Sequence, residues 1–189
     1  MPDVDIGPVG DWTPCEVTEF TSYHVGVAAE AVVASLFARC GYDVSVQYGA
    51  NQPGYDLIVS KGKAMCKVSV KGSKDGGWGL TQSFLTWGEA DYHAAIDRWL
   101  TRQPPGVVLA LVQYQHVGLT DMPRAYLATA QEIAERMRTG RGGHGDTILW
   151  ENHSWVARAA AGAGTTDRIP PEWTFSEQRI ADLLHGQTP

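Results

Sequence analysis

Residues 55–71 read YDLIVSKGKAMCKVSVK and contain two apolar segments separated by a short turn. The turn lies at 61–63, so the two segments are expected to pair as a β-hairpin. Side chains alternate between the faces of a strand, which places Ser69 and Lys71 on one side of the second segment. The pairing brings Asp56 towards the same edge of the sheet. A carboxylate and a lysine held together there can bind a divalent metal and position a water molecule.

The segments around the hairpin predict a layered α/β fold. Residues 22–40 carry apolar side chains at helical spacing, and Gly41 follows as a stop signal. Residues 44–48 alternate between apolar and polar side chains, as expected of a strand. Residues 107–114 form a continuous apolar run, which is typical of a strand covered on both faces. The expected order over residues 22–114 is therefore helix, three strands, helix and strand.

Further elements are expected beyond this core. Thr129 and Glu132 have the spacing of a capping box, which predicts the start of a helix. Helices are expected over 89–100, 129–137 and 175–184, and short strands over 124–128 and 147–150. Residues 72–79, which read GSKDGGWG, are expected to form a loop because glycine and polar residues dominate them.

Length and composition fit one folded domain. The chain has 189 residues, of which 43% are hydrophobic and 19% are charged, as is ordinary for a globular protein. Residues 1–19 contain three prolines and no periodic apolar pattern, so we expect a flexible, loosely ordered N-terminal arm. Residues 20–189 are expected to form a single domain, with a core at about 22–114 and C-terminal additions over 115–189.

The N-terminus and the cysteines favour a cytoplasmic protein. Residues 1–12 read MPDVDIGPVGDW, which is acidic and lacks the basic and apolar regions of a secretory signal. No segment approaches the roughly 18 consecutive apolar residues of a membrane span. Cys15, Cys40 and Cys66 are widely spaced and odd in number, so free thiols are expected rather than disulfides or a zinc site.

The charge distribution leaves room for local contacts with nucleic acid. A net charge of −6 disfavours a protein that coats nucleic acid through bulk electrostatics. Lysines gathered around the hairpin can still contact phosphates: Lys61, Lys63, Lys67, Lys71 and Lys74. The alternative for those outside the motif is that they keep a strand edge soluble.

A GxxxE element, GVAAE at residues 26–30, precedes Asp56 and the Ser69-Val70-Lys71 stretch. This order resembles the PD-(D/E)xK, or restriction endonuclease-like, nuclease superfamily over about residues 22–114. The resemblance implies a three-layer αβββαβ core, in which helices flank a mixed central sheet. It also implies a Mg²⁺ (or Mn²⁺) site made by Asp56 and Glu30, with Lys71 assisting the hydrolysis of a phosphodiester bond.

Ser69 departs from the superfamily pattern, which has Glu, Asp or Gln at this position. A serine hydroxyl can hold a water in the coordination shell, but it contributes no negative charge. The resemblance then gives Glu30 the part of the missing carboxylate, with Glu89 as a second candidate. The competing interpretation is that the serine marks a site that has lost hydrolytic activity.

Each candidate residue also has a structural interpretation. Aspartate is unfavourable inside an apolar strand, so Asp56 indicates either a metal ligand or a cap on backbone N–H groups. Glu30 could be a solvated helix residue, and Lys71 an ordinary strand-end lysine. Trp78 could stack on a base or anchor the loop in the core. The resemblance suggests nucleic-acid contacts for Ser73, Lys74 and Gln82, against ordinary loop polarity.

Three functional hypotheses follow. The first is a Mg²⁺-dependent nuclease acting on DNA, as a homodimer because two strands call for two sites. The second is a catalytically inactive endonuclease-fold module that binds or regulates in a DNA-processing or defence system. The third is a structural partner protein that acts through Trp150, Trp155 and Trp173, although these tryptophans are more simply packing residues.

Overall fold

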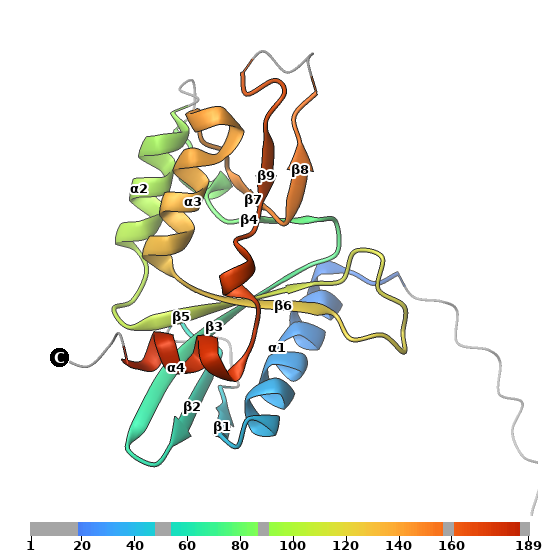
Figure 1. Cartoon of the computed structure of the whole chain (residues 1–189), viewed down its shortest axis with the longest axis vertical. Helices are drawn as coiled ribbons and strands as arrows, with labels where there is room; N and C mark the ends of the chain where they lie inside the picture. Colours follow the sequence, from blue (N-terminus) through green and yellow to red (C-terminus); the bar gives the residue numbers. More distant parts are fainter. Residues whose placement is uncertain (1–18, 48–53, 87–90, 157–160, 186–189) are drawn as a thin grey trace, which may run out of the picture.

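A five-stranded mixed sheet forms the centre of the protein (Figure 1). The computed structural model describes residues 19–47, 54–86, 91–156 and 161–185. The strands are β1 (Asp43–Val46), β2 (Leu57–Lys61), β3 (Ala64–Ser73), β5 (Val107–Gln113) and β6 (Arg124–Thr129), in the spatial order β1-β2-β3-β5-β6. Neighbouring strands are antiparallel except for β3 and β5, which are parallel.

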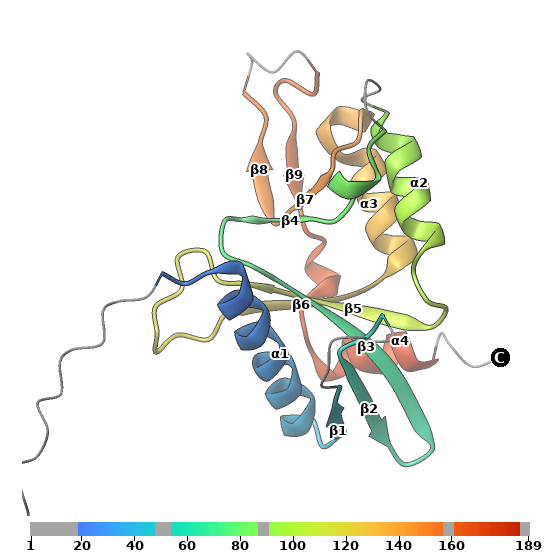
Figure 2. The same cartoon turned by 180° about the vertical axis from the view of Figure 1, so that it is seen from behind.

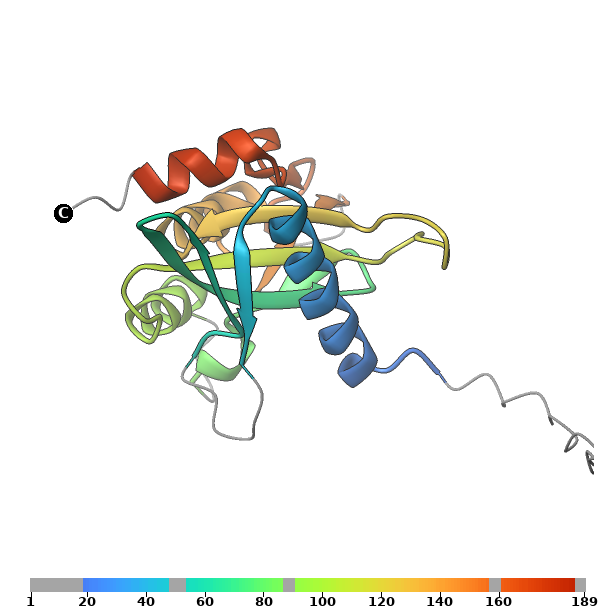
Figure 3. The same ribbon diagram turned by 90° about the horizontal axis from the view of Figure 1, so that it is seen from below.

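Four helices cover the two faces of this sheet, so the fold is mixed α/β. They are α1 (Ser22–Arg39), α2 (Tyr92–Thr101), α3 (Ala130–Gly143) and α4 (Glu177–His185). Figure 3 shows α4 and α2 on opposite sides of the strands. Helices α1 and α4 share one hydrophobic core with the sheet, and α2 and α3 share the other.

Strand β5 separates the two cores. Val108, Ala110 and Val112 pack into the core under α1 and α4. Leu109 and Leu111 pack into the core under α2 and α3. Every residue of β5 is buried, which confirms the sequence prediction of a strand covered on both faces.

The helix predictions from local signals are confirmed with small shifts in boundaries. Helix α1 ends at Arg39, two residues before Gly41, whose φ is +77°. Helix α3 begins with the predicted capping box, because the Thr129 hydroxyl accepts from the Glu132 N–H and the Glu132 carboxylate accepts from the Thr129 N–H at 2.7 Å. Helix α2 starts later than predicted, with Asp91 as its N-cap.

The prediction of a loop over residues 72–79 has to be corrected, because strands occupy both ends of this range. Strand β3 continues to Ser73, and β4 (Gly77–Gly79) pairs with β7 (Ile148–Trp150) in a small second sheet. The physical reason is Trp78, which is only 2% exposed and pulls this glycine-rich segment into the core under α2 and α3. The anchor interpretation of Trp78 is therefore the one observed.

The remaining elements extend the fold beyond residue 114. Two short turns of 3-10 helix, η1 (Gln82–Phe84) and η2 (Pro171–Trp173), and a two-stranded ribbon, β8 (Asn152–Ser154) with β9 (Thr166–Arg168), complete it. The indole N–H groups of Trp150 and Trp155 donate to Asp146 and Asp167, at 2.9 and 2.7 Å. Trp173 is buried. These contacts give all three tryptophans of the third hypothesis a structural role.

Three sequence predictions concern regions that are described only in part. The N-terminal arm lies, apart from Glu19, outside the described residues, as does Cys15. Cys40 and Cys66 are free thiols, as predicted, and burial raises the pKa of Cys66 to about 11. Within the described ranges, no helix has both the length and the apolar character that crossing a bilayer requires.

Candidate active site

A notch opens in the sheet where β2 begins. The register of the hairpin ends with Leu57 opposite Val68, so β3 runs on to Ser73 without a β2 partner. On its other side, β3 stays paired with β5 from Lys67 to Ser73. The motif residues predicted from the sequence lie on or beside this unpaired edge.

Asp56 closes the lower end of the notch. Its N–H donates to the Val68 carbonyl at 2.8 Å, and its Oδ2 accepts from the Val70 N–H at 2.5 Å. The carboxylate thereby takes the place of the strand that would otherwise pair with Val70, whose side chain is buried. The capping role considered from the sequence is therefore real. The second carboxylate oxygen accepts no hydrogen bond from the described residues, which leaves it available to a ligand.

Glu30 reaches the notch from α1. Burial raises the pKa of its carboxyl group, the nearby charge of Asp56 raises that pKa further, and Lys71 lowers it. The packing of Gly72 in β3 against Ala29 in α1 places Glu30, the next residue of the helix, beside this end of β3. The structure therefore brings together a helix residue, a residue at the start of β2 and a residue near the end of β3.

Gly72 allows α1 to lie this close to β3. A Cβ atom at this position would be 2.7 Å from Val25 Cγ1, 2.9 Å from the Val25 carbonyl oxygen and 3.1 Å from Ala29 Cβ. One of these atoms belongs to the backbone of α1, so the helix would have to move to make room. Because Glu30 follows Ala29 directly, such a movement would carry it away from the notch.

We expect Gly72→Ala to destabilise the protein by about 1–3 kcal/mol, as overpacking does in other cores. The matched control is Gly26→Ala in α1, the helix that packs on Gly72, because no atom beyond the helix's own backbone and the chain neighbours lies within 4 Å of the added Cβ. That change should stabilise the protein by about 0.5–1 kcal/mol through helix propensity. Urea unfolding of both variants gives the comparison, and equal stabilities would contradict the close packing described for Gly72.

Lys71 has a fixed backbone and an exposed side chain. Its carbonyl oxygen accepts a hydrogen bond from the indole N–H of buried Trp78 at 2.9 Å. Its ammonium group makes no hydrogen bond with the described residues, so it can act on a ligand. Ser69, two residues earlier, is only 5% exposed, and its hydroxyl likewise makes no hydrogen bond within the described ranges.

A cleft of about 260 Å³ leads away from Lys71 along the end of β3. Its walls include Ser22 in the first turn of α1, and Ser73 and Lys74. The last two already have protein partners: the Ser73 hydroxyl donates to Asp75 Oδ1 at 2.8 Å, and Lys74 Nζ donates to the Phe20 carbonyl at 2.5 Å.

Two of the three predicted nucleic-acid contacts line the cleft, and the third lies next to it, because a Cβ at Gly79, a lining residue, would be 2.6 Å from Gln82 Oε1. Ser73 and Lys74 line the cleft while holding parts of the protein together. Gln82 lies exposed on η1 and is not among the residues that line the cleft. Glu89, the second candidate carboxylate, falls outside the described residues.

The donor set fits a hard cation that keeps much of its water. Glu30 and Asp56 supply two carboxylates from different elements. Within the described ranges, no three His, Cys, Asp or Glu side chains group together as a ready-made metal site. Mg²⁺ is commonly held by only one or two carboxylates together with waters and substrate phosphates, so this pair is sufficient for it.

Two features of the site were not recognised from the sequence. The close approach at Gly72 was signalled by a glycine within a strand pattern, which often marks a neighbouring backbone. The bond from Trp78 to Lys71 had no local signal.

Comparisons with known protein families, with characterised proteins and with solved structures found no match to this chain. The chemistry of the notch is therefore the basis for assigning a function.

Proposed function

We propose that this protein is a metal-dependent nuclease that hydrolyses phosphodiester bonds, most simply in DNA. The observation that carries the proposal is the position of Asp56 and Lys71 at the unpaired edge of β3, with α1, which carries Glu30, packed against Gly72 of the same strand. Two acids and a lysine at one point, with a cleft beside them, suit an anionic substrate whose charge grows in the transition state. Apart from the short β4 and η1 between β3 and α2, the order α1, β1, β2, β3, α2, β5 supports a restriction endonuclease-like core.

Each residue has a defined part in this proposal. Glu30 and Asp56 would hold Mg²⁺ (or Mn²⁺), which supplies Lewis acidity to the phosphate and lowers the pKa of water. The Lys71 ammonium would offset negative charge on the phosphate oxygens and orient the attacking water. The Ser69 hydroxyl would form a hydrogen bond with a water held in the notch, as donor or as acceptor. In a homodimer, two such sites would serve the two strands of a duplex.

The second candidate is an inactive module with the same fold. The observation in its favour is that Asp56 has a structural role of its own, because it caps the Val70 N–H. An aspartate could therefore remain at this position without any metal. Calorimetry with Mn²⁺ separates the two candidates, since the nuclease requires binding that is lost in Asp56→Asn.

The direct test is cleavage of a substrate panel. Plasmid, linear duplex, branched DNA, single-stranded DNA and RNA are incubated with Mg²⁺ or Mn²⁺, and the products are resolved on gels. The nuclease proposal expects metal-dependent products from at least one DNA substrate and none in EDTA. A metal-independent product pattern, or no product in the whole panel, would contradict it.

The raised pKa of Glu30 gives a stability prediction. A carboxyl group whose folded-state pKa is raised stabilises the protein fully below its unfolded pKa, and this contribution is lost as pH rises through the folded pKa. At pH 7 the ionised Glu30 is therefore unfavourable in the metal-free protein. We expect Glu30→Gln to raise the melting temperature in EDTA at pH 7 while abolishing the stabilisation that Mg²⁺ or Mn²⁺ provides.

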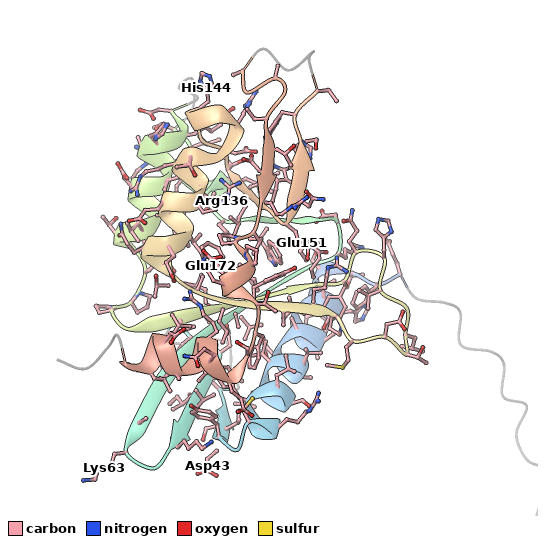
Figure 4. The ribbon with its side chains drawn as sticks, in the orientation of Figure 1. Asp43, Lys63, Arg136, His144, Glu151 and Glu172 are labelled. Carbon is pink, nitrogen blue, oxygen red and sulfur yellow. The ribbon has the colours of Figure 1, made fainter. Side chains whose placement is uncertain are left out.

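The control for Glu30→Gln is Glu172→Gln, which removes the same charge from an exposed position on η2, a different element (Figure 4). This variant should keep both the parental melting temperature and the metal response. Melting curves between pH 4 and pH 8 test the sign, because the advantage of Glu30→Gln should vanish at low pH. An advantage that is constant with pH would show that ionisation of Glu30 is not its cause.

A further inference from the structure

One face of the β2–β3 hairpin is left uncovered. Cys66, Val68 and Val70 pack into the core under α1 and α4. The residues that alternate with them point to the other face of the sheet. There Met65 is 67% exposed, and Lys67 is exposed as well.

The hairpin extends away from the helices that cover this face elsewhere. Helices α2 and α3 pack over β5 and β6, and the hairpin runs from there towards the opposite end of the molecule (Figures 1 and 2). Lys63 lies at its tip, fully away from α2 and α3 (Figure 4). Only the tip of the hairpin, residues 61–66, extends beyond the neighbouring strands, because β1 pairs with β2 from Leu57 to Ser60 and β5 pairs with β3 from Lys67 onward.

Positive charge is concentrated on the β2–β3 hairpin and the residues next to it. Residues 56–74 contain five lysines and one aspartate, although the whole chain has a net charge of −6. Two of the five are held by the protein, since Lys61 Nζ donates to the Cys40 carbonyl at 2.9 Å and Lys74 donates to the Phe20 carbonyl.

The other three lysines are available to a partner. The ammonium groups of Lys63, Lys67 and Lys71 make no hydrogen bond with the described residues, and that of Lys67 lies 5.1 Å from the centre of the Tyr55 ring. Lys67 and Lys71 share a face of β3, about 13 Å apart at the usual rise per strand residue. On β1 the only carboxylate is Asp43, which lies opposite Ser60 of the hairpin and contributes one negative charge to this end of the molecule (Figure 4).

We propose that this face of the β2–β3 hairpin binds duplex DNA beside the site, with Lys67 and Lys63 contacting the phosphate backbone. The inference rests on the proposed nuclease function and adds the path of its substrate. The distance from Lys71 to Lys67 corresponds to about four base-pair steps, so the duplex would run from the notch towards the hairpin tip.

The test measures binding without cleavage. A fluorescently labelled 20-base-pair duplex is titrated with protein in EDTA at several salt concentrations, and anisotropy gives Kd. The double variant Lys63→Ala/Lys67→Ala should bind about 10-fold more weakly or worse, with the slope of log K against log salt reduced by about 1 per lysine. Both side chains are exposed, so the melting temperature should not change.

The matched control is the double variant Arg39→Ala/Arg168→Ala, which removes the same charge from exposed residues at the end of α1 and on β9. It should keep the parental salt slope. Equal losses in the two double variants, or no measurable duplex binding by the parent at low salt, would overturn the proposed path.

The same variants separate this inference from the nuclease proposal. If the parent binds through Lys63 and Lys67 but cleaves nothing with Mg²⁺ or Mn²⁺, the proposed binding surface is supported and the proposed hydrolysis is contradicted. If the parent cleaves DNA and the lysine double variant binds and cleaves equally well, hydrolysis stands and the surface falls.

Discussion

Replacing Lys71 with alanine is expected to lower metal-dependent DNA cleavage by about 100-fold or more, as loss of a transition-state donor does in other enzymes. The side chain is exposed and makes no hydrogen bond with the described residues, so folding should be unaffected. Lys71 also lowers the pKa of Glu30. Its removal should therefore raise that pKa and shift the pH dependence of metal binding to higher values.

Lys71→Arg is the matched control, since it keeps the positive charge but changes its geometry. It should preserve the pH dependence of Mn²⁺ binding while losing part of the cleavage rate. Single-turnover cleavage and calorimetry across pH 5–8 give the two readouts. Full Mg²⁺-dependent activity in purified Lys71→Ala would remove Lys71 from the mechanism.

Substitution of Asp56 should separate its structural role from its chemical one. Asp56→Asn keeps an oxygen that can accept the Val70 N–H, whereas Asp56→Ala leaves that buried group unpaired. We expect the alanine variant to lose about 1–3 kcal/mol of stability and the asparagine variant much less. Both should lose Mn²⁺ binding and about 100-fold or more of the cleavage rate, because one of two anionic ligands is gone.

Urea unfolding, Mn²⁺ calorimetry and cleavage are measured on the same preparations of the two Asp56 variants. Equal instability of both would mean that the amide cannot replace the carboxylate in the strand. Unchanged Mn²⁺ affinity in Asp56→Asn would show that the metal does not bind at Asp56. Absence of both Mn²⁺ binding and cleavage in the parent protein would favour the inactive module over a nuclease.

The sequence predicted those parts of the fold that depend on local signals. The hairpin around 61–63, the buried strand over 107–114 and the capping box at Thr129 all follow from patterns within a few residues. Free thiols at Cys40 and Cys66 are also observed.

Other parts of the fold depend on contacts between distant segments. Strand β4 was predicted as a loop because its glycines are loop-like, but the burial of Trp78 against the core determines its structure. Strands β8 and β9 carry no strong alternation and were not predicted. Tertiary packing overrides weak local preference in both cases.

The candidate site shows the same division. Asp56, Ser69 and Lys71 follow from the hairpin register and strand alternation. The position of Glu30 beside them depends on Gly72 and the docking of α1, which no spacing rule specifies. Ser73 and Lys74 were predicted as nucleic-acid contacts because they follow the motif, but their protein partners are visible only in three dimensions.

The hydrogen bond between Asp56 and Val70 has a consequence for how this protein can change under selection. If activity were abandoned, selection for folding alone would still retain an acceptor at Asp56. Glu30 has the opposite property, because its charge is unfavourable in the metal-free protein. Once its function was lost, selection for folding would no longer retain an acidic residue at position 30. Among descendants of this chain, an acidic residue at position 30 should therefore report a working site more faithfully than the aspartate at position 56.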